Sequence, residues 1–383
     1  MQALFFSALG IFLLRFVSLV GADLVLGETV SGNVSVITTP LDAFDAPRLS
    51  AVNGTSFEWW FFDAVTKDGK NSLAVVFYRM NESEVSSPVF LQVTIAYANG
   101  TIYDISFPVN SSSVTVNGLG VSGVWGEVGT FTEAPDLSSI EFTITTKEVQ
   151  GTFKLKSFAP AHYPDGKPPL TKGASPFVAP ALGWINAIPA GRGTADLVIL
   201  GEKFAFKNMV GYHDHNFGGV SLSQGDKSWY FGHATVGPYK LVWFDVISAF
   251  TEGRTSSVYL VENNKILLAN NNSAFASDLN FGMVLPFGNG SQFPPPTSRM
   301  PDSFILSYVG EDDRHWSFVA RGRIAVDTSQ GLPAGYTRWT GKVTGGEVGG
   351  CKYVGAGVWE WLRFFDAQPV DATGNPGSGN GNY

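Results

Sequence analysis

Apolar residues occur along the chain in short runs rich in Val, Ile, Phe, Thr and Tyr, and segments of Gly, Asn, Asp and Pro separate these runs. The apolar positions follow almost no helical spacing, and runs of this length and composition are typical of β-strands. We therefore predict an all-β protein. Strands are expected at residues 73–79, 89–97, 140–146, 241–248, 303–309 and 316–324.

Two short segments carry the signals of tight hairpin turns. Gly69-Lys70 follows Asp68, and Asn99-Gly100 lies between two expected strands. The chain contains 44 Gly, and many of its apolar runs follow one another at hairpin spacing. This arrangement favours a β-sandwich or β-barrel over an α/β fold.

One string of residues occurs twice in related form. Residues 58–65 and 228–235 both follow the pattern x-Trp-(Trp/Tyr)-Phe-x-x-Ala-x, and each precedes a turn and an apolar strand. Because the two strings begin about half the mature chain apart, we predict an internal duplication that produces two β-domains. The strings are Glu58-Trp59-Trp60-Phe61-Phe62-Asp63-Ala64-Val65 and Ser228-Trp229-Tyr230-Phe231-Gly232-His233-Ala234-Thr235.

The expected domains are an N-terminal β-domain at residues 23–190 and a C-terminal barrel domain at residues 191–365. Residues 159–193 are rich in Pro and Gly, so they form either a linker or a long loop across the mouth of a cavity. Residues 287–301 form a second expected loop. The Gly-, Asn- and Ser-rich tail at residues 366–383 is expected to be disordered.

The first residues predict a secretory signal peptide at residues 1–22. Residues 4–20 are largely apolar, and small residues at 21 and 22 precede Asp23. Arg15 argues against a permanent membrane span, and no later stretch is long and apolar enough to cross a bilayer. We therefore predict a secreted glycoprotein. Its N-glycosylation sequons are Asn33, Asn53, Asn81, Asn99, Asn110, Asn271 and Asn289.

Composition favours an aromatic binding cavity. Aromatic residues make up 14% of the 383 residues, and charged residues make up 15%, against about 25% in typical proteins. The formal net charge is −8 and no block of basic residues is present, which argues against a nucleic-acid partner. Cys351 is the only cysteine, so no intrachain disulfide can form; we expect it to be buried and structural rather than a nucleophile.

Glu58 is the unusual residue of the first string because it lies between bulky rings. Burial of an unpaired carboxylate is costly, so Glu58 either pairs with an arginine, such as Arg79 or Arg338, or lines a pocket as an acid or base. Period-two alternation places Trp60 and Phe62 on the same face as Glu58. We interpret this face as the candidate pocket.

The string from Gly211 to Gly219 holds His213, Asp214 and His215. Two histidines one residue apart share a strand face and could bind zinc with a third ligand, but no further histidine lies in a ligand-like cluster. A buried hydrogen-bonded corner and a polar patch facing a ligand are the other interpretations. We therefore predict no metal at this string, and P-loop, dinucleotide and nucleophile-elbow patterns are also missing from the sequence.

Several strings together resemble the lipocalin-like superfamily of carotenoid 1,2-hydratases and fungal Diels-Alderases. The strings are Trp59-Trp60-Phe61-Phe62-Asp63, Tyr212-His213-Asp214-His215-Asn216-Phe217-Gly218, Trp229-Tyr230-Phe231-Gly232-His233 and the closing run from Gly345 to Glu360. The resemblance spans about residues 45–362. It implies two lipocalin-like β-domains, a large pocket between or within them, and no cofactor.

Within this superfamily, the chain is most similar to the secreted hetero-Diels-Alderases of tropolone sesquiterpenoid pathways, because it too has the predicted signal peptide and sequons of an exported protein. That resemblance implies an intermolecular cycloaddition between the ortho-quinone methide of a polyketide tropolone and a humulene-type sesquiterpene. The partners are then hydrophobic small molecules; the sequence predicts no particular oligomeric state. The alternatives are a decalin-forming Diels-Alderase, a terpenoid hydratase or isomerase, and a non-catalytic carrier or carbohydrate-binding module.

Strand phase and polarity provide the candidate residues. A cycloaddition requires positioning and at most a few hydrogen bonds, so we expect aromatic walls and a small number of polar groups. The candidate catalytic residues are Glu58, His213, Asp214 and Tyr230. The candidate substrate-binding residues are Trp60, Phe62, Tyr78, Trp243 and Trp339.

Overall fold

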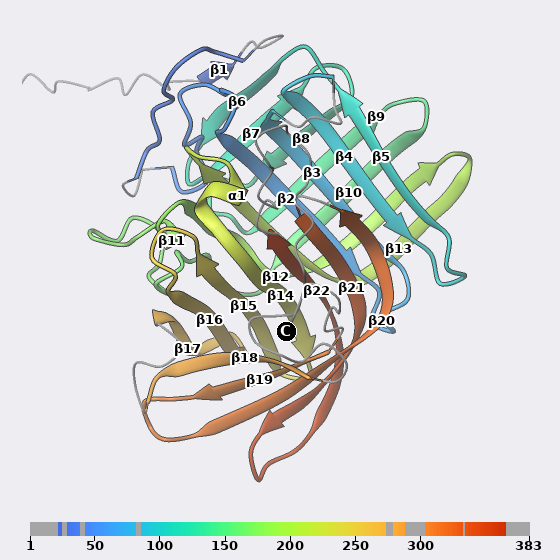
Figure 1. Cartoon of the computed structure of the whole chain (residues 1–383). Coiled ribbons are helices and arrows are strands. Elements are labelled where there is room, and N and C mark those ends of the chain that lie inside the picture. Colours follow the sequence, from blue (N-terminus) through green and yellow to red (C-terminus); the bar gives the residue numbers. More distant parts are fainter. Residues whose placement is uncertain are drawn as a thin grey trace, which may run out of the picture.

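The computed structural model describes residues 22–24, 29–38, 43–81, 86–272, 279–287, 303–331 and 334–364. These residues form two antiparallel sheets and one short helix, α1 (Leu222–Gly225), in agreement with the all-β prediction (Figure 1). The predicted signal peptide up to residue 21, residues 288–301 of the second expected loop and the predicted tail at residues 366–383 lie outside the described residues. Among the described residues, no helix has the length and apolar character that a membrane crossing requires.

The first sheet holds the N-terminal strands and has thirteen members within the described chain. In spatial order they are β1 (Ala22–Leu24), β6 (Ser112–Asn117), β7 (Gly120–Trp125), β8 (Gly129–Glu133), β9 (Ser139–Thr145), β10 (Val149–Ser157), β12 (Leu182–Ile199), β13 (Glu202–Gly218), β2 (Phe57–Val65), β3 (Ser72–Met80), β4 (Val89–Ala96) and β5 (Ile102–Pro108), with β11 (Phe177–Ala179) paired to β12.

The second sheet holds the remaining nine strands of the described chain. In spatial order they are β17 (Lys265–Asn272), β16 (Arg254–Glu262), β15 (Tyr239–Ser248), β14 (Asp226–Val236), β22 (Tyr353–Phe364), β21 (Ala334–Glu347), β20 (His315–Gly331), β19 (Ser303–Val309) and β18 (Phe281–Phe287). All six strands expected from the sequence are present.

Each sheet curls around its own core, which gives two barrel-like domains (Figure 1). A third apolar cluster fills the space between the two sheets. The outer face of each curled sheet therefore packs against the other sheet, and this explains why strands such as β2 carry large rings on both faces. One set of rings fills a barrel, and the other set builds the contact between domains.

The duplicated strings form equivalent strands at the contact between the sheets. β2 lies between β13 and β3, and β14 lies between β22 and β15. Phe61 and Phe231 occupy matching positions, and their ring centroids are 6.3 Å apart. Asp63 and His233 also match, and His233 Nε2 lies 2.7 Å from Asp63 Oδ1. The two copies of the string therefore face each other, as expected of a duplicated β-module.

The boundary between the sheets lies later than the predicted boundary at residues 190 and 191. Those residues are inside β12, and the chain changes sheet between Gly218 and Asp226. Glycine in this part of β12 does not mark a linker; it leaves room for a side chain of the neighbouring strand. A Cβ added to Gly191 would lie 2.6 Å from Leu155 Cδ1 of the neighbouring β10.

Residues 158–176, which precede β11, join the two domains. His162 stacks on Tyr259 of β16 with ring centroids 4.0 Å apart, and Tyr259 Oη donates to the Pro160 carbonyl at 3.0 Å. Ser257 Oγ donates to the Pro164 carbonyl at 2.7 Å. The segment at residues 159–193 is therefore neither a free linker nor one long loop, because its first half packs on the second sheet and its second half forms strands.

The exposure of Cys351 differs from the sequence prediction, and the exposure of the sequon asparagines varies from site to site. Cys351 is exposed, contrary to the expected buried position, because it follows the tight turn that connects β21 to β22. Asn271 is half-buried, and its amide donates to the carbonyls of Phe177 and Val178 at 3.4 Å. The sequons at Asn33, Asn81, Asn99 and Asn110 are exposed, Asn53 is half-buried and Asn289 lies outside the described residues. Glycosylation stays a prediction.

Glu58 takes the first of its two predicted roles, an ion pair with an arginine. Its Oε2 lies 3.3 Å from Arg79 Nη1, and both side chains are fully buried inside the first barrel. The backbone N–H of Arg48 and the His215 ring also contact the Glu58 carboxylate. Arg338, the other predicted partner, pairs with Glu360 instead.

We expect Arg79→Ala to lower the free energy of unfolding by about 3–5 kcal/mol, because it leaves the Glu58 carboxylate buried without its guanidinium. Urea denaturation followed by far-UV circular dichroism measures this change. Lys154→Ala is the matched control, since it breaks an exposed pair with Glu141 and should cost at most about 1 kcal/mol. Equal losses in the two variants would contradict a role of the buried pair in stability.

Candidate functional site

A cavity of about 570 Å³ lies between the two sheets. Its walls are formed mainly by aromatic and aliphatic side chains, and a smaller polar group lies among them. The apolar lining consists of Trp59, Phe61, Tyr78, Met80, Phe90, Leu222, Trp229, Phe231, Phe244, Tyr336, Leu362 and Phe364. The polar lining consists of Gln92, Asp104, Ser106, Asp214, Asn216, Arg338 and Glu360.

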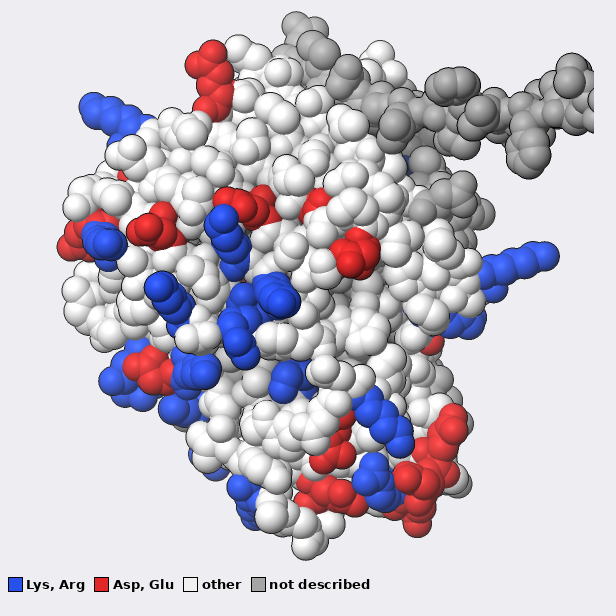
Figure 2. Space-filling view, turned by 180° about the vertical axis from the view of Figure 1, so that it is seen from behind, with Lys and Arg blue, Asp and Glu red and all other residues white. Residues whose placement is uncertain are grey.

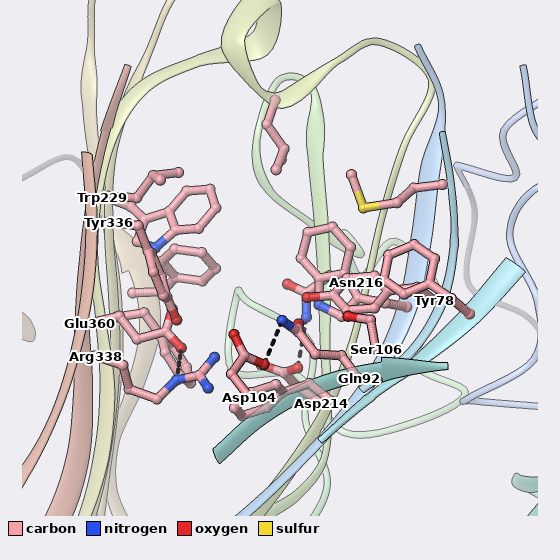
Figure 3. Close-up of a pocket in the computed structure, with 18 of the residues that line it drawn as sticks. Tyr78, Gln92, Asp104, Ser106, Asp214, Asn216, Trp229, Tyr336, Arg338 and Glu360 are labelled. Atoms are coloured by element: carbon pink, nitrogen blue, oxygen red, sulfur yellow. Dashed lines mark hydrogen bonds and ion pairs between the residues drawn. The ribbon is translucent and has the colours of Figure 1, made fainter. Parts of the chain in front are cut away.

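Strand alternation decides which rings reach this cavity, which we call the front cavity. Alternate residues of β2 and β14 point between the sheets, so Trp59 and Phe61 of β2 face Trp229 and Phe231 of β14. Figure 3 shows the two walls: Trp229, with residues of β21 and β22, lies across the cavity from residues of β3, β4, β5 and β13. A ligand in the front cavity would contact both domains.

Asp214 and Glu360 are buried acids of the front cavity, and the Asp214 carboxylate is held by three side chains. Trp184 Nε1 and Tyr212 Oη both donate to Oδ2 at 2.8 Å, and Asn216 Nδ2 donates to Oδ1 at 2.6 Å. Burial raises the pKa of Asp214 to about 7, although the hydrogen bonds from Tyr212 and Trp184 favour the ionised form. Because Oδ2 already accepts two hydrogen bonds, the proton of the neutral acid belongs on Oδ1, the oxygen that faces Asn216.

The Tyr212 hydroxyl can donate its hydrogen bond either to Asp214 or to Asn186, and the charge of Asp214 influences which acceptor it uses. This hydroxyl lies 2.8 Å from Asp214 Oδ2 and 2.6 Å from Asn186 Oδ1, and its single proton serves one acceptor at a time. Burial, together with the adjacent Asp214 carboxylate, raises the pKa of Tyr212 well above its usual value, so the phenol stays protonated. Asp214 is thus linked to a neutral hydroxyl that does not compete for ionisation.

The opposite wall carries the only cation of the front-cavity lining, Arg338. Its Nε donates to Glu360 Oε1 at 2.9 Å, and its guanidinium lies 5.1 Å from the Phe61 ring centroid. On the first sheet, Gln92 Nε2 donates to Asp104 Oδ1 at 3.0 Å. Most of these polar groups are therefore hydrogen-bonded to one another around an otherwise apolar volume, which suits a ligand that is largely hydrophobic with a few polar atoms.

The alternation of β13 divides the histidine-containing string between two environments. Asp214 and Asn216 face the front cavity, whereas His213 and His215 point into the first barrel. His213 Nε2 lies 3.0 Å from Glu133 Oε1 and 3.4 Å from Asp45 Oδ2. Two of the sequence interpretations therefore apply together: the histidines form a buried hydrogen-bonded cluster, and Asp214 belongs to a polar patch facing the cavity.

This buried cluster is an ion network. Burial opposes the charged form of His213, but hydrogen bonds and charge contacts with Asp45 and Glu133 outweigh it and raise the pKa to about 10. Burial also opposes ionisation of Asp45, and its contacts with His213 and His215 lower its pKa to about 2. Burial and repulsion from Asp45 raise the pKa of Glu133 to about 7. Removing any one charge leaves its partners buried without compensation.

The same cluster contains a set of groups with metal-ligand spacing. Asp45, Glu133 and His213 each offer one ligand atom, and these atoms lie within 4.8 Å of one another. A metal requires the neutral imidazole, whereas the contacts of His213 favour the protonated ring. The donor set therefore fits an ion network better than a metal site.

Of the nine residues predicted to bind substrate or act in catalysis, Tyr78 and Asp214 line the front cavity. Trp60 and Phe62 lie in the core of the first barrel, and Glu58 and His213 belong to its ion network. Tyr230, Trp243 and Trp339 lie in the core of the second barrel. The predicted pocket face of β2 is therefore the barrel-facing side, and the opposite side lines the front cavity.

Four cavity residues that were not among the sequence candidates could have been found from the duplicated strings. Trp59 and Trp229 are identical at matching positions of the duplicated strings, and so are Phe61 and Phe231. These are the residues that meet at the contact between the two copies. Arg338 and Glu360 had no comparable signal, because they approach the cavity from strands far apart in the sequence.

Comparisons with known proteins agree with this architecture. A model of the Diels-Alderase-like family matches residues 18–365. The chain is 31% identical to the quinolone epoxide rearrangement protein penF of Penicillium thymicola over 84% of this chain and 90% of that protein. It is 27% identical to the Diels-Alderase cheD of Chaetomium globosum over 88% of this chain and 82% of that protein. The crystal structure of CghA with Sch210972 superposes with a TM-score of 0.73 at 21% identity, covering 91% of this chain and 99% of that chain.

Trp59 and Trp60 provide a test of the two faces of β2. We expect Trp59→Ala to weaken binding of the apolar dye N-phenyl-1-naphthylamine by about tenfold, because about 1.4 kcal/mol of aromatic contact is lost. Stability should change little, since Trp59 is only half-buried. Trp60→Ala should instead cost about 3–5 kcal/mol of unfolding free energy, because it empties a packed core. Dye titration and urea denaturation of both variants measure these effects; the reverse pattern would show that ligands bind inside the barrel.

Proposed function

Since the chain belongs to the Diels-Alderase-like family, we propose that this cyclase performs an intermolecular hetero-Diels–Alder reaction in the front cavity. The reactants are the ortho-quinone methide of a polyketide tropolone and a humulene-type sesquiterpene. The observation that carries the proposal is a cavity of about 570 Å³ with facing aromatic walls and, at its edge, the buried carboxyl group of Asp214, whose pKa is raised to about 7. The relatives named Diels-Alderases support the reaction class.

Positioning is the main contribution that the cavity can make. The alkene is entirely apolar and fits among the facing rings of Trp59, Phe61, Trp229 and Phe231. Holding two reactants in one orientation can remove up to about 7–11 kcal/mol of barrier in ideal cases. Because the rings come from two domains, each wall can contact one reactant and thereby restrict the face from which the alkene approaches.

Polar groups add a smaller electrostatic contribution. As the new C–O and C–C bonds form, the oxygen of the heterodiene becomes an ether oxygen, and hydrogen-bond donation to that oxygen beforehand withdraws electron density from the diene. Asp214 Oδ1–H and the second N–H of Asn216 are two of the donors on the first sheet that can serve this purpose; Gln92 and Ser106 also line the cavity. No proton is transferred in this step, so atoms and electrons balance within the two reactants.

A second candidate is the acid-assisted rearrangement of an epoxide, favoured by Asp214 and by the relative penF, which is named a quinolone epoxide rearrangement protein. Asp214 Oδ1 would give its proton to the epoxide oxygen while a C–O bond breaks. The facing rings would stabilise the cationic carbon. After a group migrates and a proton is lost from the substrate, Asp214 regains its proton.

Export is the remaining part of the proposal. The apolar N-terminal segment and the exposed sequons at Asn33, Asn81, Asn99 and Asn110 support passage through the secretory pathway. In that setting the enzyme would meet its substrates in an oxidising compartment, where it has no disulfide to form.

We expect the enzyme to change the stereochemical ratio of adducts formed from a quinone-methide precursor and humulene, and Trp229→Ala to return that ratio towards the spontaneous value. The reason is that Trp229 forms part of one wall of the cavity and limits the approach of the alkene. Chiral chromatography of timed reactions measures the ratio. Identical yield and stereochemistry with and without enzyme would remove the cycloaddition from consideration.

Asp214→Asn distinguishes the two candidates. If Asp214 only donates a hydrogen bond, the amide can replace it, and we expect a rate within about tenfold of the original with little pH dependence. Acid catalysis would instead lose about 100-fold or more. Because the pKa of Asp214 is raised to about 7, an acid-catalysed rate would be maximal well below pH 7, where Asp214 is protonated, and would fall as the pH rises through 7. Initial rates between pH 5 and 9 for both proteins give the answer.

A further inference from the structure

A second hollow of about 330 Å³ lies at the opposite end of the contact between the two sheets. Figure 2 shows the back of the molecule, where Lys and Arg side chains gather over the middle of the face. We call this hollow the basic groove. Its lining residues are Lys67, Phe158, Gly191, Arg192, Asn208, Met209, Val210, Thr235, Gly237, Pro238, Lys240, Asn263 and Asn264.

The basic groove and the front cavity are built from the same strand faces. Along β14, Phe231 lines the front cavity, His233 is buried in the middle, and Thr235 lines the groove. Along β13 the corresponding order is Asp214, Tyr212 and Val210. His233 stacks on Tyr212 with ring centroids 4.7 Å apart and bonds to Asp63, so a packed layer separates the two hollows.

The charge of the groove differs from that of the whole chain. Three of its lining side chains are cationic and none is acidic, although the chain has a net charge of −8. Within the described part of the chain, no carboxylate forms an ion pair with Lys67, Arg192 or Lys240. The positive charge of the groove is therefore available to a ligand.

The lack of a counter-ion affects the ammonium group of Lys240 most directly. Its ammonium is half-buried and reaches only the carbonyl oxygens of Pro238 and Tyr239, at 3.4 and 3.5 Å. Burial lowers its pKa, and no acid of the protein opposes that effect. An anion bound in the groove would supply the missing charge, and it would do so where water is partly excluded.

The rest of the lining determines what kind of anion fits. Phe158, Met209 and Pro238 are apolar, and the Arg192 guanidinium lies 5.2 Å from the Phe158 ring centroid. The side-chain amides of Asn208, Asn263 and Asn264 add neutral hydrogen-bond donors. An arginine whose guanidinium lies over a ring keeps its N–H donors free to bind two oxygens of one carboxylate or phosphate.

We propose that the basic groove binds a small organic anion, in which carboxylate or phosphate oxygens meet Lys67, Arg192 and Lys240 and a short apolar body lies on Phe158 and Pro238. Arg192 lies on β12 of the first sheet, Lys67 lies in the turn that connects β2 to β3 of the same sheet, and Lys240 lies on β15 of the second sheet, so the ligand bridges the two domains. This site is separate from the front cavity and does not depend on the reaction performed there.

Calorimetric titration tests the proposal with three probes: inorganic phosphate, hexyl phosphate and hexanoate. We expect saturable binding of one equivalent, tighter for hexyl phosphate than for inorganic phosphate because of the apolar wall. Comparison with hexanoate shows whether the groove prefers phosphate or carboxylate. Binding should weaken as salt increases, because exposed charges are screened.

The double variant Lys67→Gln with Arg192→Gln removes two exposed cations, and we expect it to weaken binding of the preferred probe at least tenfold. Lys203→Gln is the matched control, because Lys203 is an exposed lysine of β13 outside the groove. If the double variant proves unstable to urea, Lys240→Met, which keeps the alkyl stem, should show the same loss.

Two outcomes would overturn the proposal. One is no saturable binding of any of the three probes, and the other is equal affinity in the double variant and in Lys203→Gln. Displacement of N-phenyl-1-naphthylamine from the front cavity by hexyl phosphate at the same concentration would also contradict it, because the anion would then occupy the front cavity. The binding measurement is independent of any catalytic assay, so failure of the proposed reaction leaves it unaffected.

Discussion

The contact between β2 and β14 is the interaction on which the architecture depends. Each strand lies within its own curled sheet and presents one face to a barrel core and the other face to its counterpart. At the centre of the contact, Asp63 and His233 are both about 1% exposed and share a hydrogen bond of 2.7 Å. A buried polar pair of this kind requires its partner, so it fixes the register between the two domains.

That register creates the front cavity. Two residues from the Asp63–His233 pair, Phe61 and Phe231 are still in contact, and beyond them the walls separate far enough to leave a volume of about 570 Å³. The strongly charged groups inside the first barrel remain on the other side of β2 and β13. The cavity therefore combines apolar walls with a few polar groups, among them Asp214, whose pKa burial raises to about 7 and whose carboxyl group accepts a hydrogen bond from Tyr212.

Much of the fold was predictable from the sequence, because strand alternation and turn residues are local signals. The duplicated strings also predicted two related domains, and Gly69 and Gly100 occupy the expected hairpin turns with positive φ. The domain boundary was misplaced because glycine has two uses. At Gly191 it lets Leu155 of the adjacent strand pack closely, and that requirement comes from strand pairing that the local sequence does not encode.

The site was less predictable for a related reason. Alternation separates Trp59 from Trp60, but which of the two faces fills a barrel depends on how the distant second sheet packs. Asp214 was among the candidates, yet its relation to Trp184 and Tyr212 arises from pairing between β12 and β13. Arg338 and Glu360 enter the cavity only because β21 and β22 continue the sheet of β14.

We propose that ligands occupy the space between the domains rather than the interior of either barrel. A crystal structure of the protein with an adduct of the reaction bound is the most direct measurement. We expect density for the adduct between Trp59 and Trp229, within reach of Asp214 and Asn216. Density for the adduct beside Trp60 in the first barrel, or beside Trp243 in the second, would contradict it.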